Sequence, residues 1–133
     1  MPETRTHRLL VVDDAPDTRE VLHRNLTSRG YDVITATSGV EAVAKASREN
    51  PDAVLLDVLM RDMNGFQVCR LLTSNESTQH IPIVLVSSKT QQTDRMWGEQ
   101  QGARAYITKP YTPDQILQQL RAFESASPTE PGR

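Results

Sequence analysis

Short apolar runs recur along this chain, and each run stops at a polar side chain. Residues 9–12, 53–56 and 83–86 consist only of Ala, Val, Leu and Ile, with no polar residue at alternate positions. Such runs are typical of strands that are covered on both faces, as in a parallel sheet with helices on either side. The sequence therefore favours an α/β fold built on a buried sheet.

Two further strands are predicted. Residues 31–36 alternate in the way expected of a strand with one exposed face. Residues 105–108 form another short run, which leads into Lys109 and Pro110. Together with the three apolar runs, these segments predict a sheet of five strands.

Helical patterns separate the strands. Pro16 suits a first helical turn, Ser38 and Glu41 form a capping box, and Thr112 with Pro113 gives a further start signal. Alternation of five strands with five helices predicts a doubly wound parallel sheet with right-handed crossovers. The expected helices cover residues 16–29, 38–47, 65–72, 91–101 and 113–123.

The fourth of these helices is expected to be the weakest. Met96 and Trp97 are its main apolar residues, and Trp97 is expected to anchor it against the core. Gly98 lies in its interior, where glycine costs up to about 1 kcal/mol relative to alanine. A helix held in this way should be easy to shift.

Composition fits one small domain. The chain has 133 residues, of which 37% are hydrophobic and 24% are charged, so it can form a core without disulfides or metals. The domain is expected to cover residues 1–125. Residues 126–133 are rich in Ser, Pro, Thr and Gly and are expected to form a flexible tail.

Charge and patterning exclude several classes of protein. A formal charge of −2 argues against nucleic-acid binding, which needs a concentrated basic surface. No apolar run approaches the roughly 20 residues that a membrane helix requires, and the N-terminal residues lack the apolar stretch of a signal peptide. The single cysteine, Cys69, is expected to be a small packing residue in a reducing compartment. A cytoplasmic protein that contacts other proteins is therefore expected.

Polar side chains stand where the predicted strands end. A single aspartate there is commonly a turn residue, but this chain places Asp13, Asp14, Asp57, Ser87 and Lys109 after four different strands. In a doubly wound sheet the carboxyl ends of the strands share one edge, and ligands bind beyond it. We expect these five side chains to converge.

The predicted cluster has a definite chemistry. Crowded carboxylates resist joint ionisation unless a cation supplies charge, and oxygen ligands completed by water suit Mg²⁺. With Asp13 and Asp14 on the metal, Asp57 could act as a nucleophile toward phosphorus and form an aspartyl phosphate. Lys109 and the Ser87 hydroxyl would then contact phosphoryl oxygens.

With these residues in place, the chain resembles the response-regulator receiver domain of two-component signalling over about residues 8–123. The motifs that carry the resemblance are Val11-Val12-Asp13-Asp14, Leu55-Leu56-Asp57, Met60, Met63-Asn64-Gly65, Ile81-Pro82-Ile83-Val84-Leu85-Val86-Ser87 and Thr108-Lys109-Pro110. The resemblance implies a flavodoxin-like sheet of order 2-1-3-4-5. It also implies phosphoryl transfer from a sensor histidine kinase or a histidine phosphotransfer domain to Asp57, with Mg²⁺ as cofactor.

The resemblance assigns further roles. It implies that Mg²⁺ is held by Asp13, Asp14, Asp57 and the backbone carbonyl of Leu59. It implies that Ser87 and Tyr106 form a switch. Because the fourth helix is expected to be weakly held, we expect the output surface to be the one made by the fourth helix, fifth strand and fifth helix. The resemblance also implies a cis peptide before Pro110.

The output would be binding of a protein target, by a monomer or a weak phosphorylation-dependent dimer. Such a protein is not an enzyme in the usual sense, since its own chemistry is limited to gaining and losing the phosphoryl group.

A narrower likeness concerns residues 87–89, 93–98 and 101–106, which are similar to stand-alone receivers of pilus chemosensory systems, including twitching motility. One departure is Arg61, because the family usually has proline after the methionine at position 60. Leu59 and Lys89 lie two places after Asp57 and Ser87, where the family controls access of attacking water. Apolar Leu59 predicts slow self-dephosphorylation.

Three alternatives stay open at this point. An aspartate-nucleophile phosphatase of the haloacid-dehalogenase kind is disfavoured, because those enzymes place their acids as Asp-x-Asp on the first strand. The input half of a transcription factor is disfavoured because nothing after Phe123 could form a helix-turn-helix. A phosphate sink for a shared kinase cannot be separated from a protein-binding switch by the sequence.

Overall fold

A computed structural model of the protein describes residues 7–88 and 92–125. Five parallel strands form one sheet in the order β2-β1-β3-β4-β5, as predicted. The strands are β1 (Arg8–Val12), β2 (Asp32–Ala36), β3 (Ala53–Asp57), β4 (Ile83–Ser87) and β5 (Ala105–Thr108). The expected tail at 126–133 lies outside the described residues, so the proposed domain boundary remains a prediction.

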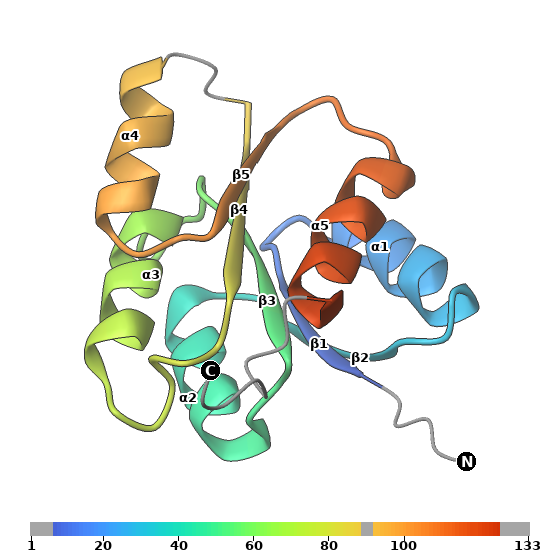
Figure 1. Cartoon of the computed structure of the whole chain (residues 1–133), viewed down its shortest axis with the longest axis horizontal. Coiled ribbons are helices and arrows are strands. Elements are labelled where there is room, and N and C mark those ends of the chain that lie inside the picture. Colours follow the sequence, from blue (N-terminus) through green and yellow to red (C-terminus); the bar gives the residue numbers. More distant parts are fainter. Residues whose placement is uncertain (1–6, 89–91, 126–133) are drawn as a thin grey trace.

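Helices cover both faces of the sheet (Figure 1), with α2, α3 and α4 on one side and α1 and α5 on the other. Their bounds agree with the sequence patterns to within a few residues. The helices are α1 (Pro16–Ser28), α2 (Gly39–Glu49), α3 (Gly65–Ser74), α4 (Gln92–Gln100) and α5 (Pro113–Ser125). The chain thus has the doubly wound, flavodoxin-like architecture that the sequence predicts. Among the described residues, no helix combines the length and the apolar character that crossing a bilayer requires.

The core is divided in two by the sheet. Leu10, Leu56 and Leu85 point into one cluster, beneath α2 and α3, and Val11 and Val84 point into the other, beneath α1 and α5. Neighbouring residues of one strand therefore serve opposite faces, which explains why β1, β3 and β4 carry no polar alternation. The strands have to be apolar throughout because both of their faces are buried.

Cys69 fills the first cluster and is fully buried. Burial raises the pKa of its thiol to about 12, so the thiolate that would react is scarce at neutral pH. Its Sγ donates to the carbonyl oxygen of Gln101 at 3.3 Å. The predicted packing role is confirmed.

Helix starts follow the sequence signals with one difference. The Ser38 hydroxyl accepts from the Glu41 amide, as predicted, but the Glu41 carboxylate accepts from the amide of Thr37 at 2.8 Å, one residue before Ser38. At α5, Thr112 and Gln115 form reciprocal bonds between backbone and side chain. The capping box of α2 is therefore displaced, and a further box at α5 is complete.

Helix α4 docks differently from the expectation. Trp97 is 49% exposed and touches Phe66 edge to face, with ring centroids 6.5 Å apart, and Met96 is half exposed. Gly98 is the one buried residue of α4. A Cβ on Gly98 would lie 2.9 Å from Leu85 Cδ1, so glycine is what lets the helix approach the sheet. Trp97 is a partial anchor only, which corrects the prediction.

Candidate functional site

Three carboxylates meet at the carboxyl edge of the sheet. Asp13 and Asp14 directly follow β1, and Asp57 is the last residue of β3. Strands β1 and β3 are hydrogen-bonded neighbours, with Val12 opposite Leu56. Consequently Asp13, Asp14 and Asp57 each offer an oxygen within 4.8 Å of the others. The convergence of these three acids is confirmed.

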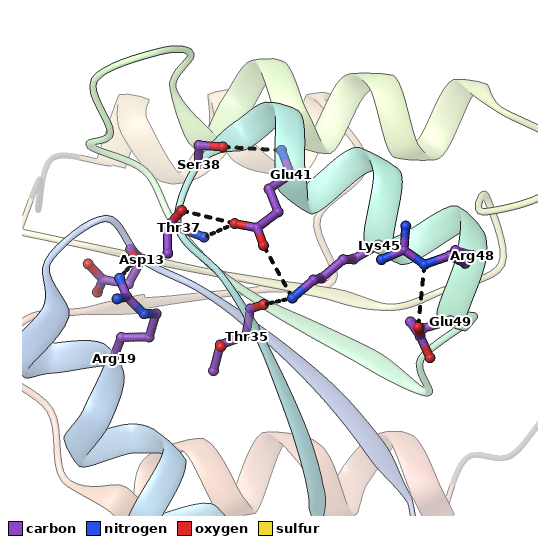
Figure 2. A network of polar contacts seen from close by, with 9 residues as sticks. All are labelled: Asp13, Arg19, Thr35, Thr37, Ser38, Glu41, Lys45, Arg48 and Glu49. Carbon is purple, nitrogen blue, oxygen red and sulfur yellow. Dashed lines mark hydrogen bonds and ion pairs between the residues drawn. The ribbon is translucent and has the colours of Figure 1, made fainter.

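Asp13 is held by its backbone as well as by its side chain. Its amide donates to the Ala36 carbonyl at 3.2 Å, which extends the pairing of β1 with β2 by one residue. Its own carbonyl accepts from the Arg19 guanidinium at 2.8 Å, as Figure 2 shows. One carboxylate oxygen accepts from the Ala15 amide at 2.9 Å. Asp13 is thereby fixed before any ligand arrives.

Asp57 and Lys109 form an ion pair across the edge of the sheet. The Lys109 ammonium lies 3.3 Å from one Asp57 oxygen, and the Asp57 side chain is 8% exposed. Burial, followed by the charge of Asp13, raises the pKa of Asp57 above its ordinary value, although Lys109 opposes this. Lys109 therefore does not offset the combined effect of burial and of the Asp13 charge on Asp57. The peptide between Lys109 and Pro110 is cis, as the family resemblance implies.

Helix α3 approaches the strand that carries Asp57 very closely. The Gly65 amide donates to the Val58 carbonyl at 2.8 Å. A Cβ on Gly65 would lie only 2.6 Å from the Asp57 carbonyl oxygen, which is a backbone atom that cannot swing aside. Asn64 and Gln67 add a full capping box at the start of the helix. Glycine at 65 is therefore a requirement of the site and not only a helix boundary.

The loop between β3 and α3 is latched onto the start of α2. The two oxygens of Asp62 accept from the amides of Gly39 and Val40 at 3.0 and 3.1 Å. These bonds lower the pKa of Asp62, as expected for a carboxylate at the positive end of a helix. Met63 lies over Gly39, where a Cβ would come within 2.3 Å of Met63 Cγ. The loop following Asp57 is thus held at its far end.

Arg61 contacts Asp14 from that same loop. Its amide donates to Asp14 Oδ2 at 3.1 Å, and its guanidinium Nε lies 3.8 Å from the same oxygen. The Arg61 side chain is 91% exposed. The departure from proline at this position therefore adds a positive charge beside the site, and that charge is paired with a site carboxylate.

Ser87 and Leu59 have contrasting settings. Ser87 is fully buried at the end of β4, and its carbonyl accepts from the Lys109 amide at 2.8 Å. Leu59 is 53% exposed in the loop after Asp57. Lys89, which the sequence paired with Leu59, lies outside the described residues. The hydroxyl role of Ser87 and the carbonyl role of Leu59 remain predictions.

Tyr106 is buried under Arg95. The guanidinium carbon of Arg95 lies 5.3 Å from the centre of the Tyr106 ring, and Nη1 of Arg95 donates to the Tyr106 carbonyl at 3.1 Å. This contact joins α4 to β5. Tyr106 was predicted as a switch residue, but Arg95 was not singled out, because an exposed arginine in a helix has no pattern that marks it.

Tyr111 is a further residue that the sequence did not single out. Burial raises its pKa, and the charges of Asp13 and Asp57 add to the shift, so its hydroxyl lies within the field of the acids. It follows the cis Pro110 in the loop after β5. The sequence feature that could have identified Tyr111 is its position directly after the Lys109-Pro110 motif.

A polar network fixes the loop on the other flank of the site (Figure 2). Glu41 accepts from both the amide and the hydroxyl of Thr37, and it forms an ion pair of 3.2 Å with Lys45. Lys45 also donates to the Thr35 carbonyl at 2.6 Å. The contacts with Thr37 and Lys45 lower the pKa of Glu41, chiefly through the Thr37 amide. The loop that joins β2 to α2 is therefore braced at several points.

The carboxylate cluster fits a hard divalent cation. Its donors are all oxygens, two of the three acids are buried, and burial together with the charge of Asp13 raises the pKa of Asp57. Mg²⁺ prefers such ligands and retains several waters. Asp13, Asp14 and Asp57 are the side chains that could hold it.

Comparison with known proteins settles the family. A family profile described as response regulator receiver domain matches residues 9–121. The chain belongs to this family. This receiver is 43% identical over 115 residues to Protein PilH of Pseudomonas aeruginosa, which covers 86% of this chain and 95% of PilH.

Other relatives are longer or known in three dimensions. Response regulator PleD of Caulobacter vibrioides is 41% identical over 87% of this chain, but the receiver spans only 26% of PleD. The crystal structure of chemotaxis protein CheY4 of Vibrio cholerae superposes with a TM-score of 0.84 at 30% identity, covering 89% of this chain and 98% of CheY4. The receiver thus shares its fold with a chemotaxis protein.

Proposed function

We propose that this receiver accepts a phosphoryl group on Asp57 from a phosphohistidine of a sensor histidine kinase or a histidine phosphotransfer domain. A carboxylate oxygen of Asp57 would bond to phosphorus as the phosphorus–nitrogen bond breaks. The electron pair goes to the imidazole nitrogen, which takes a proton from solvent. The observation that carries the proposal is the meeting of Asp13 and Asp14 with the Asp57–Lys109 pair.

Each neighbour of Asp57 has a proposed task. Lys109 would move its ammonium from Asp57 to a phosphoryl oxygen, and Ser87 would donate a hydrogen bond to another. Mg²⁺, held by Asp13, Asp14, Asp57 and the Leu59 carbonyl, would offset the charge on the transferred group. Arg19 and the bonds to Asp13 keep one ligand in place beforehand. This receiver would turn over no separate substrate.

The output surface is proposed to be formed by α4, β5 and α5. Ser87 and Tyr106 would act as the switch, with Ser87 drawn toward the phosphoryl group and Tyr106 filling the space behind it. Helix α4 is suited to respond, because Gly98 is its one buried residue and a weakly held element can shift for a few kcal/mol. A protein target would read the changed surface, with the receiver acting as a monomer or a weak phosphorylation-dependent dimer.

The setting is proposed to be a stand-alone regulator of motility or chemosensory signalling in the cytoplasm. The 43% identity to PilH over nearly its whole length supports this, as does the narrower likeness to pilus chemosensory receivers. A phosphate sink is the second candidate. Pull-down with and without phosphorylation separates the two, since a switch gains a protein partner and a sink does not.

The test of phosphoryl transfer is intact mass after treatment with Mg²⁺ and a small phosphodonor. The protein should gain one phosphoryl group, and Asp57→Asn should gain none. Asp114→Asn is the matched control, because its carboxylate is 80% exposed on α5, pairs with Arg29 and is not one of the three clustered acids. A gain that survives in Asp57→Asn would refute the assignment, and turnover of a small phosphate ester would revive the phosphatase alternative.

Leu59 is proposed to slow self-dephosphorylation. Its apolar side chain is 53% exposed two places after Asp57, where it would hinder the attacking water. Leu59→Asn should shorten the lifetime of the phosphoryl group. Leu71→Asn, at a similarly exposed position on α3, is the control and should leave the lifetime unchanged. An equal lifetime in both variants would refute this role.

A further inference from the structure

Arg61 contacts Asp14 through both its backbone amide and its guanidinium. Its amide donates to Asp14 Oδ2 at 3.1 Å and its guanidinium lies 3.8 Å from that oxygen. Proline, which the family resemblance leads one to expect here, has neither the donor nor the charge. The contact is thus a property of this chain and not of the family pattern.

The backbone keeps Arg61 beside the site. The amide bond to Asp14 fixes one side of the residue, and the next residue, Asp62, is fixed by its bonds to Gly39 and Val40. An exposed guanidinium alone is a mobile charge, but here its Cα is held next to Asp14. The positive charge therefore stays near the carboxylates even when the side chain rotates.

Three cationic side chains of the protein already lie beside the acids. Lys109 pairs with Asp57, Arg61 pairs with Asp14, and the Arg19 guanidinium lies on the carbonyl of Asp13. Of these cations, Arg61 alone has a side chain that is almost fully exposed beside a site carboxylate. It can be altered without opening the core.

We propose that Arg61 sets the affinity of the carboxylate site for divalent cations, because its guanidinium competes with the cation for Asp14. This inference rests on the proposed function, since it takes the acids to be the cation site. Removal of the guanidinium should tighten cation binding about two- to fivefold, the size of effect that an exposed ion pair produces. The consequence is a receiver that needs a higher magnesium concentration to become competent.

The experiment measures cation binding by the full chain in two ways. Mg²⁺ is titrated by calorimetry, and Mn²⁺ is titrated while the electron paramagnetic resonance signal of the free ion is followed. Arg61→Ala should bind about two- to fivefold more tightly than wild type at about 20 mM ionic strength. The difference should vanish at about 0.5 M, because salt screens exposed charges. Arg61→Lys keeps a charge at the site and should bind like wild type.

Arg48→Ala is the matched control. It removes the same charge from the end of α2, where Arg48 pairs with Glu49, and should leave cation affinity unchanged. Equal gains in Arg48→Ala and Arg61→Ala would show an effect of net charge and overturn the inference. Affinity in Arg61→Ala no higher than wild type at low salt would overturn it as well.

Asp13→Asn separates this inference from the proposed function. Cation binding that is lost in Asp13→Asn, with Arg61→Ala equal to wild type, would overturn the role of Arg61 alone. Cation binding that is absent from wild type, or unchanged in Asp13→Asn, would overturn both the cation site and the inference. Matching urea midpoints for wild type, Arg61→Ala and Arg48→Ala would establish that all three are equally folded.

Discussion

Helices α3 and α4 lie side by side on one face of the sheet (Figure 1), but they are attached by different means. Helix α3 starts with a complete capping box and buries Val68, Cys69 and Leu72. Helix α4 buries Gly98 alone and leaves Met96 and Trp97 half exposed. One helix is built into the core, and the other rests on it through a glycine.

The difference matches the two tasks that we propose for this receiver. Gly65 of α3 touches the backbone of Asp57, so a firm α3 keeps the carboxylate in position. Helix α4 contacts β5 through the Arg95–Tyr106 pair, and its shallow burial leads us to expect that it can shift at small cost in free energy. The firmly packed helix α3 thus lies beside the proposed phosphorylation site, and the loosely packed helix α4 lies on the surface that a partner is proposed to read.

The largest contrast should come from truncating one side chain on each helix. Leu72→Ala removes a fully buried side chain of α3 and should lower the free energy of unfolding by about 2–5 kcal/mol. Met96→Ala on α4 should change it by no more than about 0.5 kcal/mol. Urea denaturation measures both, with Leu71→Ala as the exposed control on α3. Similar losses for Leu72→Ala and Met96→Ala would contradict the comparison.

Replacing one glycine by alanine on each helix should sharpen the comparison between α3 and α4. Gly65→Ala forces a Cβ against the Asp57 carbonyl oxygen and should cost about 1–3 kcal/mol. In Gly98→Ala the Cβ meets Leu85 Cδ1 at 2.9 Å and Cδ2 of the Tyr106 ring at 3.3 Å, side-chain atoms and not backbone, and about 1 kcal/mol of helix propensity is regained. We expect Gly98→Ala to be near neutral in stability while the fluorescence of Trp97 changes. A loss as large as that of Gly65→Ala would show α4 to be firmly seated.

The cap of α3 should contribute less. Asn64→Ala removes the side chain that accepts from the Gln67 amide at 2.9 Å and should lower stability by about 1 kcal/mol. Asn64→Asp keeps the acceptor and should stay close to wild type. Thermal and urea midpoints report the change. A neutral Asn64→Ala would mean that packing alone secures the start of α3.

The smallest change in stability should come from the site itself, and it should be a gain. Because the pKa of Asp57 is raised in the folded protein, the unfolded chain ionises first as pH rises, and ionised Asp57 weakens the fold. Asp57→Asn should match wild type below the ordinary pKa of 3.8. It should be the more stable protein once pH exceeds the raised pKa. Urea midpoints from pH 3 to pH 8 without divalent cation would test this, and equal midpoints at neutral pH would contradict it.

Much of the fold could be read from the sequence because buried parallel strands need continuous apolar runs. Those runs also located the acids, since a parallel sheet brings the carboxyl ends of its strands to one edge. Asp13, Asp14, Asp57 and Lys109 were therefore predictable as a cluster. The helix starts at Pro16, Ser38 and Thr112 were predictable as well, because their signals lie within a few neighbouring residues.

The remaining contacts depend on the path of a loop, which leaves no periodic pattern in the sequence. The latch of Asp62 on α2 and the bond from Arg61 to Asp14 arise only when residues 58–64 fold back across the edge of the sheet. Docking of α4 was misjudged for a related reason. Trp97 looked like an anchor by its size, but Gly98 decides how closely the helix can approach.

The bond from Lys45 to Thr35 has a consequence for how copies of this protein meet. Strand β2 is at an edge of the sheet, and an open edge invites strands of other molecules to add to it. Lys45 already takes the Thr35 carbonyl and sets a cation beside it. At this point of the border, the strand of a neighbouring molecule would therefore find the carbonyl occupied and a positive charge beside it.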